Sequence, residues 1–142
     1  MIREGCEILI YLENVSKCYK NGVNALDNIN LQINDGEFVY IIGPTGSGKS
    51  TLIKLLDGEE IPTAGTVSVE GIDVGKLKHR RVPYYRRNIG VVFQDFRLLP
   101  HMTIFENVAF ALEAIGKDKV SIRRRVREVL ELVDLSDKAK SF

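Results

Sequence analysis

The segment from residue 43 to residue 50 has the residue types and spacing of a phosphate-binding loop. It fits the pattern G-x-x-x-x-G-K-[ST]. Its glycines allow backbone N–H groups to turn inward and hold phosphate oxygens, while Lys49 would reach the outer phosphates and the Ser50 hydroxyl would ligate Mg²⁺. The alternative is a glycine turn without function, and chance gives such a match in on the order of one chain per few hundred of this length. We therefore predict that ATP or a similar nucleotide binds to Gly43, Pro44, Thr45, Gly46, Ser47, Gly48, Lys49 and Ser50.

The residues on either side of this loop predict a strand and then a helix. The run Phe38–Ile42 is apolar throughout, as a strand buried on both faces would be. After Lys49, apolar residues recur with helical spacing as far as Leu56, and Gly58 ends the pattern. The positive end of this helix would add to the attraction for phosphate.

Hydrolysis of a bound nucleotide needs a second metal contact and a group that orients water. Gln94 and Asp95 directly follow a second apolar run, Ile89–Phe93. An amide such as that of Gln94 can ligate Mg²⁺ and hold a water, but it is equally consistent with a polar residue that merely ends a strand. Asp134 also follows apolar residues, although their helical spacing favours a solvated helix end. The residues alone leave Gln94 and Asp95 open as candidates.

Tyr19 precedes the turn signal Asn21-Gly22. Its ring could stack on a nucleotide base, although an aromatic residue near a strand is more often simply packed.

A basic segment runs from Lys76 to Arg97, with Tyr84 and Tyr85 interleaved and Asp95 as its single acid. This composition could indicate nucleic acid or anionic lipid as a partner. Because the net charge of the chain is only +1, a solvated surface or a protein-docking surface is favoured, and we predict no nucleic-acid partner. The segment's Lys and Arg residues are Lys76, Lys78, Arg80, Arg81, Arg86, Arg87 and Arg97.

The length of 142 residues fits one ordinary domain, and a hydrophobic content of 44% is enough for a core. Cys6 and Cys18 form neither a disulfide framework nor a metal pattern. No apolar stretch is long enough to span a bilayer, and the start of the chain is not a secretory signal. A reduced cytosolic compartment is expected.

The rest of the chain predicts antiparallel strands first and helices last. Runs Ile8–Leu12 and Ile29–Ile33, separated by turn signals, favour antiparallel pairing, and Thr66–Val69 is a further short strand. Thr103 followed by Glu106 is a capping-box pattern that begins a helix. We expect this helix to bury Ile104, Val108, Ala111, Leu112 and Ile115, and a second helix to bury Ile122, Val126, Val129, Leu130 and Val133.

Four segments together resemble the nucleotide-binding domain of ABC ATPases: Gly43–Thr51, Gly90–Gln94, Leu98–Pro100 and Thr103–Val108. The sequence from Val92 to Pro100, together with Pro83–Arg87 before it, is similar to the bacterial cell-division branch of that family. Lipoprotein-release and macrolide-exporter ATPases are near relatives. The resemblance extends from Ile8 to about Lys138.

The resemblance implies a P-loop NTPase fold of the α/β class, with an N-terminal antiparallel β-subdomain and the start of a helical subdomain. It implies that Tyr19 stacks on adenine, that Thr51 joins the nucleotide-binding residues, and that Gln94 contacts Mg²⁺ and the attacking water. It further implies that the segment Gln94–Asn107 docks an FtsX-like integral membrane protein. The complete protein would be a homodimer, cytoplasmic and peripheral on the inner face of the cell membrane.

The chain departs from the family pattern because it lacks a Leu-Ser-Gly-Gly-type signature loop, a second acidic strand, the catalytic glutamate and the switch histidine. We therefore expect one partial domain, with the β-subdomain and P-loop core in residues 1–97, the start of the helical subdomain in 98–142, and the C-terminal half absent. Such a chain would bind nucleotide without hydrolysing it. The alternatives are the ATPase subunit of a lipoprotein-release or macrolide-exporter type ABC transporter, a non-hydrolysing regulatory module, and a small kinase using Asp95. Leu98–Pro100 does not resemble a kinase lid.

Overall fold

The computed structural model describes residues 8–142 and divides the chain into two compact units. The first unit ends at Gly90 and the second runs from Val91 to Phe142. This boundary precedes the predicted division between residues 97 and 98. Local contacts explain the difference, because the guanidinium of Arg97 lies 3.6 Å from the centroid of the Phe93 ring and ties the turn at 94–97 to Val91–Phe93.

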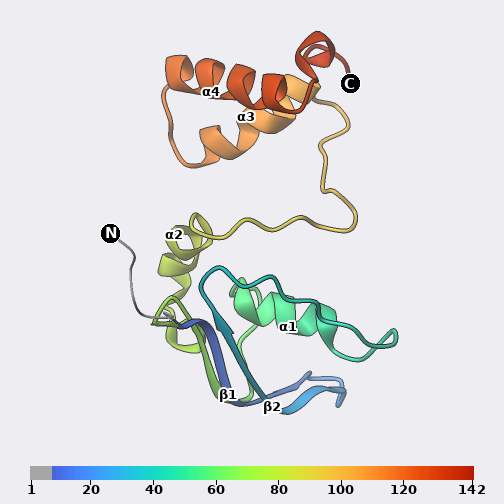
Figure 1. The fold of residues 1–142 in the computed structure, drawn as a ribbon, viewed down its shortest axis with the longest axis vertical. Helices are drawn as coiled ribbons and strands as arrows, with labels where there is room; N and C mark the ends of the chain where they lie inside the picture. The colour runs from blue at the N-terminus through green and yellow to red at the C-terminus, as the bar shows by residue number, and fades with distance from the viewer. Residues whose placement is uncertain (1–7) are drawn as a thin grey trace. The chain divides into compact units, whose positions relative to one another are not determined.

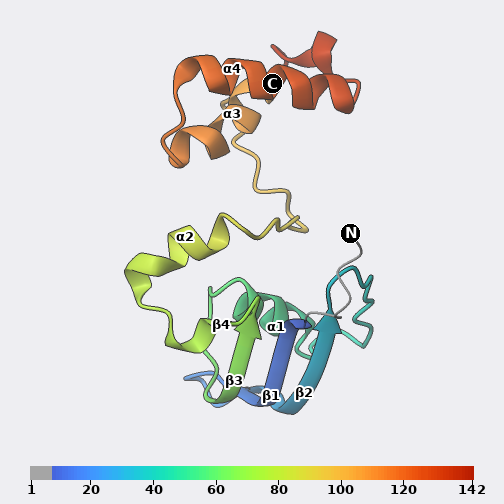
Figure 2. The same cartoon turned by 60° about the vertical axis from the view of Figure 1, so that its left-hand side comes forward.

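The first unit contains a four-stranded antiparallel sheet with the strand order β2-β1-β3-β4. The strands are β1 (Ile8–Cys18), β2 (Asn24–Asn34), β3 (Ala64–Val69) and β4 (Ile72–Asp73). The helix α1 (Lys49–Leu56) covers one face of this sheet (Figures 1 and 2). The predicted antiparallel pairing of the first two strands is confirmed.

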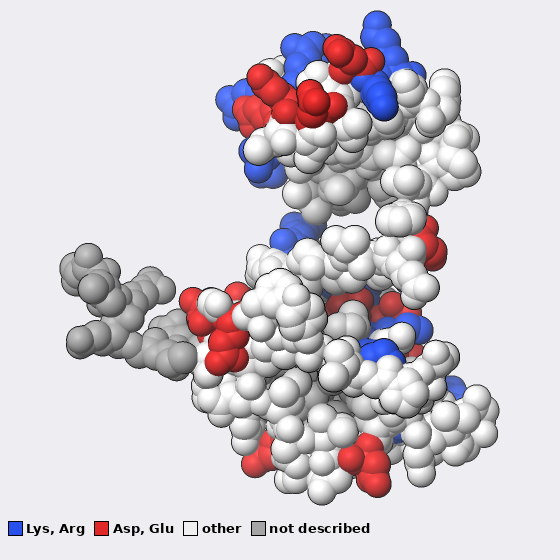
Figure 3. Space-filling view, turned by 45° about the vertical axis from the view of Figure 1, so that its right-hand side comes forward, with Lys and Arg blue, Asp and Glu red and all other residues white. Residues whose placement is uncertain are grey.

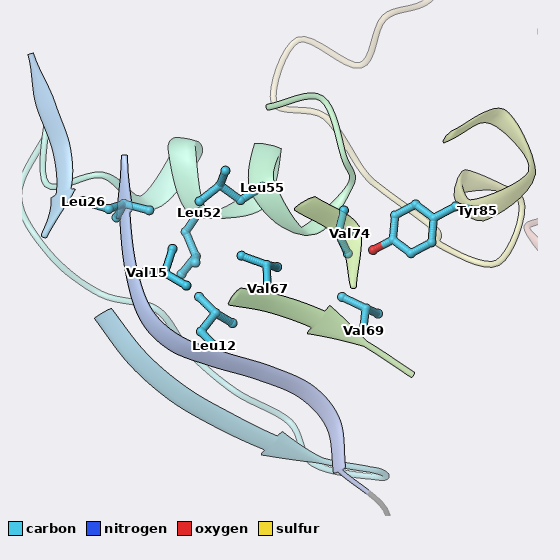
Figure 4. Packing of buried hydrophobic residues seen from close by; sticks show 9 residues of the cluster. All are labelled: Leu12, Val15, Leu26, Leu52, Leu55, Val67, Val69, Val74 and Tyr85. Carbon is cyan, nitrogen blue, oxygen red and sulfur yellow. The ribbon is translucent and has the colours of Figure 1, made fainter. Parts of the chain in front are cut away.

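The core of the first unit lies between the sheet and α1 (Figure 4). Leu12, Val15 and Val67 from the sheet meet Leu52 and Leu55 from the helix, and all five are buried. Burying each such side chain contributes roughly 1.5–3 kcal/mol, so this contact fixes α1, and with it the loop that precedes α1, against the sheet.

A short helix packs against one end of this core. Two 3₁₀ turns, Val74–Lys76 and His79–Arg81, lead into α2 (Val82–Arg86). From α2, Tyr85 enters the core beside Val74 and Val69, and its hydroxyl donates to the carbonyl of Leu56 at the end of α1 (Figure 4).

A bulge in β1 carries the strand beyond the predicted Ile8–Leu12. Leu12 and Val15 are both buried although they are three residues apart, because Asn14 has a φ of 50° and the register shifts between them. The amide of Asn14 donates to the side chain of Asn30 at 2.9 Å, so the bulge leaves no unpaired N–H group there.

The predictions of strands at Phe38–Ile42 and Ile89–Phe93 are wrong for this structure. Neither run is a strand, and Phe38, Tyr40 and Ile42 are 80% or more exposed. An apolar run predicts that a segment is suited to a buried position in a sheet. It forms a strand only when a neighbouring strand is present to share backbone hydrogen bonds with it. Among residues 8–142 neither run has such a neighbour.

The second unit is a pair of helices, α3 (Ile104–Ala114) and α4 (Lys119–Leu132), followed by the 3₁₀ turn Ser136–Lys138. The predicted capping box is confirmed at the start of α3, where Thr103 and Glu106 exchange hydrogen bonds. These bonds lower the pKa of Glu106. Charged side chains of both signs gather on one side of this unit, at the top of Figure 3.

The buried faces of the two helices differ in part from the prediction. Their core consists of Ala109, Ile122, Val126 and Leu130. Ala111, Ile115 and Val133 are exposed, which corrects their predicted burial. The helix α3 contacts α4 along a face rotated toward Ala109, because Phe105 and Leu112 share that face. No helix within residues 8–142 has the length and hydropathy needed to cross a bilayer.

Candidate nucleotide-binding site

Gly48 joins the predicted phosphate-binding loop to the sheet. It has a φ of 88° and is the N-cap residue of α1. A Cβ at this position would collide with the carbonyl oxygen of Ala25 and with Cδ2 of Leu26 on β2. Only glycine combines this left-handed backbone with such a close approach, so the last glycine of the motif is required by packing as well as by phosphate access.

Lys49 folds its side chain back over the loop. Its ammonium lies 2.8 Å from the carbonyl oxygen of Gly43, 2.7 Å from that of Pro44 and 3.2 Å from Oγ of Ser47. The three N–H donors of one ammonium therefore converge on the inner side of the loop. Anionic oxygens accept hydrogen bonds more strongly than these neutral oxygens do, so phosphate oxygens could replace them as acceptors for the Lys49 ammonium.

The first turn of α1 supplies further donors. A helix leaves its first amide N–H groups without intrahelical acceptors, and α1 has no side-chain cap because its N-cap residue is a glycine. These groups and the positive end of the helix favour an anion at this position. The site therefore combines backbone donors, a helix terminus and one ammonium, which is the donor set that a nucleotide phosphate requires.

A Mg²⁺ ion fits this arrangement through Ser50. Ser50 is exposed in the first turn of α1, beside Lys49. Within residues 8–142, no three His, Cys, Asp or Glu side chains form a metal-binding group. Mg²⁺ at nucleotide sites takes few ligands from the protein and the rest from phosphate oxygens and waters, so the Ser50 hydroxyl could supply one of the protein ligands.

Tyr19 lies beside the loop, although it is 24 or more residues away in sequence. Its hydroxyl oxygen is 3.2 Å from Oγ1 of Thr51, in the first turn of α1. Thr51 is buried and Tyr19 is half-buried. The structure thus brings Tyr19 and the end of the loop together within the first unit.

Lys17, which the sequence did not single out, also contacts Tyr19. Its ammonium lies over the ring, 5.2 Å from the centroid. That ammonium is held 2.7 Å from Oε2 of Glu60 and 2.8 Å from the carbonyl oxygen of Ile61. No pattern in the sequence links Lys17 with Glu60, because 42 residues separate them along the chain.

Gln94 and Asp95 belong to the second unit, where both are exposed in a turn. The carboxylate of Asp95 lies 3.8 Å from Nε of Arg97, a local ion pair. The roles of Gln94 as a metal and water contact stay predictions.

The predicted docking segment, Gln94–Asn107, is irregular as far as Thr103, where the cap of α3 begins. Phe96 and Leu98 are 73% and 67% exposed, while Leu99 is half-buried. Asn107 accepts a hydrogen bond from the Leu99 amide and donates to three backbone carbonyls of the segment. The sequence predicted neither this role of Asn107 nor the inward position of Leu99.

The basic segment is partly engaged within the chain. Lys76 pairs with Asp73 at 2.7 Å, Arg86 donates to the carbonyl of Asp57 at 2.9 Å, and Arg87 lies over the Tyr84 ring. Tyr85 is a core residue. These contacts support the interpretation of the segment as an ordinary surface of the fold.

Comparison with known proteins supports a nucleotide-binding site at this loop. Residues 26–142 match the ABC transporter family. The chain belongs to this family. The match includes the whole phosphate-binding loop and both helices of the second unit.

Several relatives are cell-division proteins. The chain is 52% identical over 134 residues to the cell division ATP-binding protein FtsE of Bacillus subtilis. The aligned region covers 94% of this chain and 59% of that protein. The chain is 55% identical over 133 residues to the FtsE protein of Mycobacterium tuberculosis, covering 93% of this chain and 58% of that one. It is also 46% identical to the methionine import ATP-binding protein MetN of Helicobacter hepaticus, covering 94% of this chain and 38% of that protein.

The fold matches solved ABC cassettes. The dimeric post-hydrolysis structure of the ATP-binding cassette MJ0796, bound to ADP and Pi, has a TM-score of 0.82 and 38% identity, over 93% of this chain and 60% of that one. The predicted fold class, a P-loop ABC cassette with an antiparallel subdomain, is confirmed. The chain spans about 60% of the length of the FtsE relatives that it matches.

Proposed function

We propose that this chain is the ATP-binding part of an FtsE–FtsX-like ABC complex that acts in bacterial cell division. The observation that carries nucleotide binding is the geometry at Lys49, whose ammonium meets three oxygens of the loop at the first turn of α1. The cell-division assignment is supported by 52% and 55% identity to two FtsE proteins. ATP and Mg²⁺ are the proposed ligands, and hydrolysis is proposed for the complete domain.

The proposed roles divide between the two units. Gly43–Ser50 hold the phosphates, and Ser50 is also a ligand of the metal. Thr51, in the first turn of α1, joins the nucleotide-binding residues, and Tyr19 stacks on the base. Gln94, in the second unit, would contact Mg²⁺ and the attacking water. A P-loop supplies only part of the hydrolytic machinery, so the 142-residue chain by itself is proposed to bind nucleotide without turnover.

The docking segment is proposed to bind an FtsX-like integral membrane protein, which would place the complex on the cytoplasmic face of the cell membrane. Exposed Phe96 and Leu98 support this proposal, because neighbouring exposed apolar side chains are suited to a protein partner. A homodimer of the complete protein is supported by the dimeric MJ0796 cassette.

A second candidate is the ATPase subunit of a transporter. The 46% identity to a methionine import protein supports it. The two candidates differ in the membrane protein that the docking segment binds, so partner identification separates them.

Nucleotide binding is tested with Lys49→Ala. The variant removes a charge-assisted contact worth about 1.5–3 kcal/mol, so ATP affinity measured by calorimetry should fall at least about tenfold. The matched control is Lys54→Ala, which removes a lysine at the far end of the same helix. Equal affinity of Lys49→Ala and the unsubstituted chain, with both folded, would contradict the proposal.

Partner binding is tested by co-purification of the complete protein with an FtsX-like protein. Leu98→Asp should abolish co-purification. Leu132→Asp is the matched control, because Leu132 is also an exposed leucine of the second unit but lies at the end of α4. Retention of the partner by Leu98→Asp, or its loss with both variants, would contradict docking through this segment.

A further inference from the structure

Two hydroxyl groups meet at the edge of the loop without a function assigned to their contact. The hydroxyl oxygen of Tyr19 lies 3.2 Å from Oγ1 of Thr51. Thr51 is only 8% exposed, so water has little access to its hydroxyl, and the tyrosine is the partner that the structure provides. The bond connects the end of β1 with the first turn of α1.

Tyr19 needs such an anchor because it lies outside regular structure. β1 ends at Cys18, and Tyr19 begins a turn in which its amide donates to Val23 and its carbonyl accepts from Gly22. These backbone bonds fix the main chain but leave the ring free to rotate about its side-chain bonds. The bond to Thr51 removes that freedom at the far end of the ring.

Lys17 restrains the same ring from one face. Its ammonium lies over the ring and is fixed in turn by Glu60 and by the carbonyl of Ile61. The side chain of Lys17 is 11% exposed, so its position is set by packing. Because Lys17 lies over one face, a planar ligand would stack on the opposite face of the Tyr19 ring.

We propose that Thr51 is a positioning residue for the nucleotide base, because its hydroxyl holds Tyr19 in the orientation that stacks on that base. This inference rests on the proposed function. A ring fixed before binding loses less conformational entropy when a base stacks on it, so the tether increases affinity for nucleotides. It leaves the affinity for phosphates without a base unchanged.

The test compares ATP with inorganic tripolyphosphate, by calorimetry, for Tyr19→Phe, Thr51→Val and the double variant. Each single variant removes one hydroxyl and keeps the shape of the side chain. One neutral hydrogen bond corresponds to an affinity change of about two- to tenfold. Both single variants should lose this factor for ATP, the double variant should lose no more than either single one, and Tyr19→Phe should bind tripolyphosphate as the unsubstituted chain does.

Tyr11→Phe is the matched control, because Tyr11 is a partly exposed tyrosine of β1, the strand that precedes Tyr19, and the variant should bind ATP unchanged. Unchanged ATP affinity of Tyr19→Phe would overturn the tether, as would losses that add in the double variant. A loss of tripolyphosphate affinity in Thr51→Val would also overturn it, since it would place the Thr51 hydroxyl on the phosphates. Failure of the unsubstituted chain to bind either ligand would instead contradict the proposed function.

Discussion

The side-chain amide of Asn107 binds both backbone polar groups of Leu99. Its Oδ1 accepts from the Leu99 amide at 2.8 Å, and its Nδ2 lies 3.1 Å from the Leu99 carbonyl oxygen. The same Nδ2 also lies 3.0 Å and 3.1 Å from the carbonyl oxygens of Met102 and Thr103. One residue of α3 therefore fixes the irregular backbone between Leu99 and Thr103.

Replacement of Asn107 should destabilise the second unit. Asn107→Ala leaves partly buried backbone groups unpaired, each worth about 1–3 kcal/mol, and should lower the urea midpoint of unfolding. Asn107→Asp should be at least as harmful, because it keeps the acceptor for Leu99 but places a carboxylate against carbonyl oxygens. Glu113→Ala, at an exposed position of the same helix, is the control and should leave the midpoint unchanged.

Gly48 should not tolerate a side chain. Gly48→Ala adds a Cβ that collides with the backbone of Ala25, whereas Gly71→Ala adds one with nothing within 4 Å. Both glycines have positive φ, 88° and 74°, so both variants carry similar backbone strain of about 1 kcal/mol. The further loss in thermal stability and in ATP affinity for Gly48→Ala measures the collision. Equal behaviour of the two variants would contradict the close approach.

Tyr19 should contribute to base binding and not to phosphate binding. Tyr19→Ala should weaken ATP and ADP binding by a similar amount, about 1–3 kcal/mol, by analogy with base–aromatic stacking. Calorimetry with the two nucleotides measures both losses. A loss confined to ATP would point to the outer phosphate instead, and no loss would return Tyr19 to a packing role.

The parts of the structure that the sequence predicted are those whose cause is local. The capping box needs only Thr103 and Glu106, three residues apart, and the loop and α1 follow from a contiguous motif. The antiparallel pairing of β1 and β2 follows from alternation around a turn. Such features depend on interactions between near neighbours, and a pattern in the sequence records them.

Other features depend on residues that are far apart in the sequence, and no sequence pattern predicts them. The bulge at Asn14 shifts the buried positions of β1 from a two-residue to a three-residue spacing, and its amide is satisfied by Asn30 on the facing strand. The contact of Tyr19 with Thr51 joins residues 32 positions apart. The strand predicted at Phe38–Ile42 failed for the same reason, because a strand requires neighbours that periodicity does not reveal.

Tyr85 should give the first unit a stability that depends on alkaline pH. Burial, followed by the charges of Asp57 and Glu70, raises the pKa of Tyr85 from 10.0 to about 12. A raised pKa means that the folded chain favours the neutral phenol, so this contribution is complete below about pH 10 and is lost as the pH rises toward 12. Its size is at most about 2–3 kcal/mol. Urea unfolding at a series of pH values from 8 to about 12 measures the loss.

Tyr85→Phe is the comparison for that series. The variant removes the bond to the Leu56 carbonyl, so it should be less stable at pH 8. Its stability should then fall less steeply between pH 10 and 12, because no phenol titrates in the core. Parallel curves for the two proteins would assign the alkaline loss to other groups.

Phosphate release from ATP requires more groups than this chain supplies. Gly43–Ser50 can hold the phosphates, and Gln94 could help to place a metal and a water, but neither supplies a carboxylate at the attacking water. Asp95 is the nearest acid to Gln94, and it is paired locally with Arg97. The 142 residues also contain no Leu-Ser-Gly-Gly-type loop that a second copy could place against the nucleotide.

The purified 142-residue chain should therefore bind Mg²⁺-ATP without steady turnover. Loss of groups that act as a unit lowers the rate by on the order of a thousandfold or more, so phosphate release should match that of Lys49→Ala within error. A coupled phosphate assay over several hours measures both, and calorimetry on the same samples should show that the unsubstituted chain binds ATP at least about tenfold more tightly than Lys49→Ala. Steady release above Lys49→Ala would overturn the prediction. Asp95→Asn would then be the variant to measure, because a loss of that release would identify Asp95 as the carboxylate responsible.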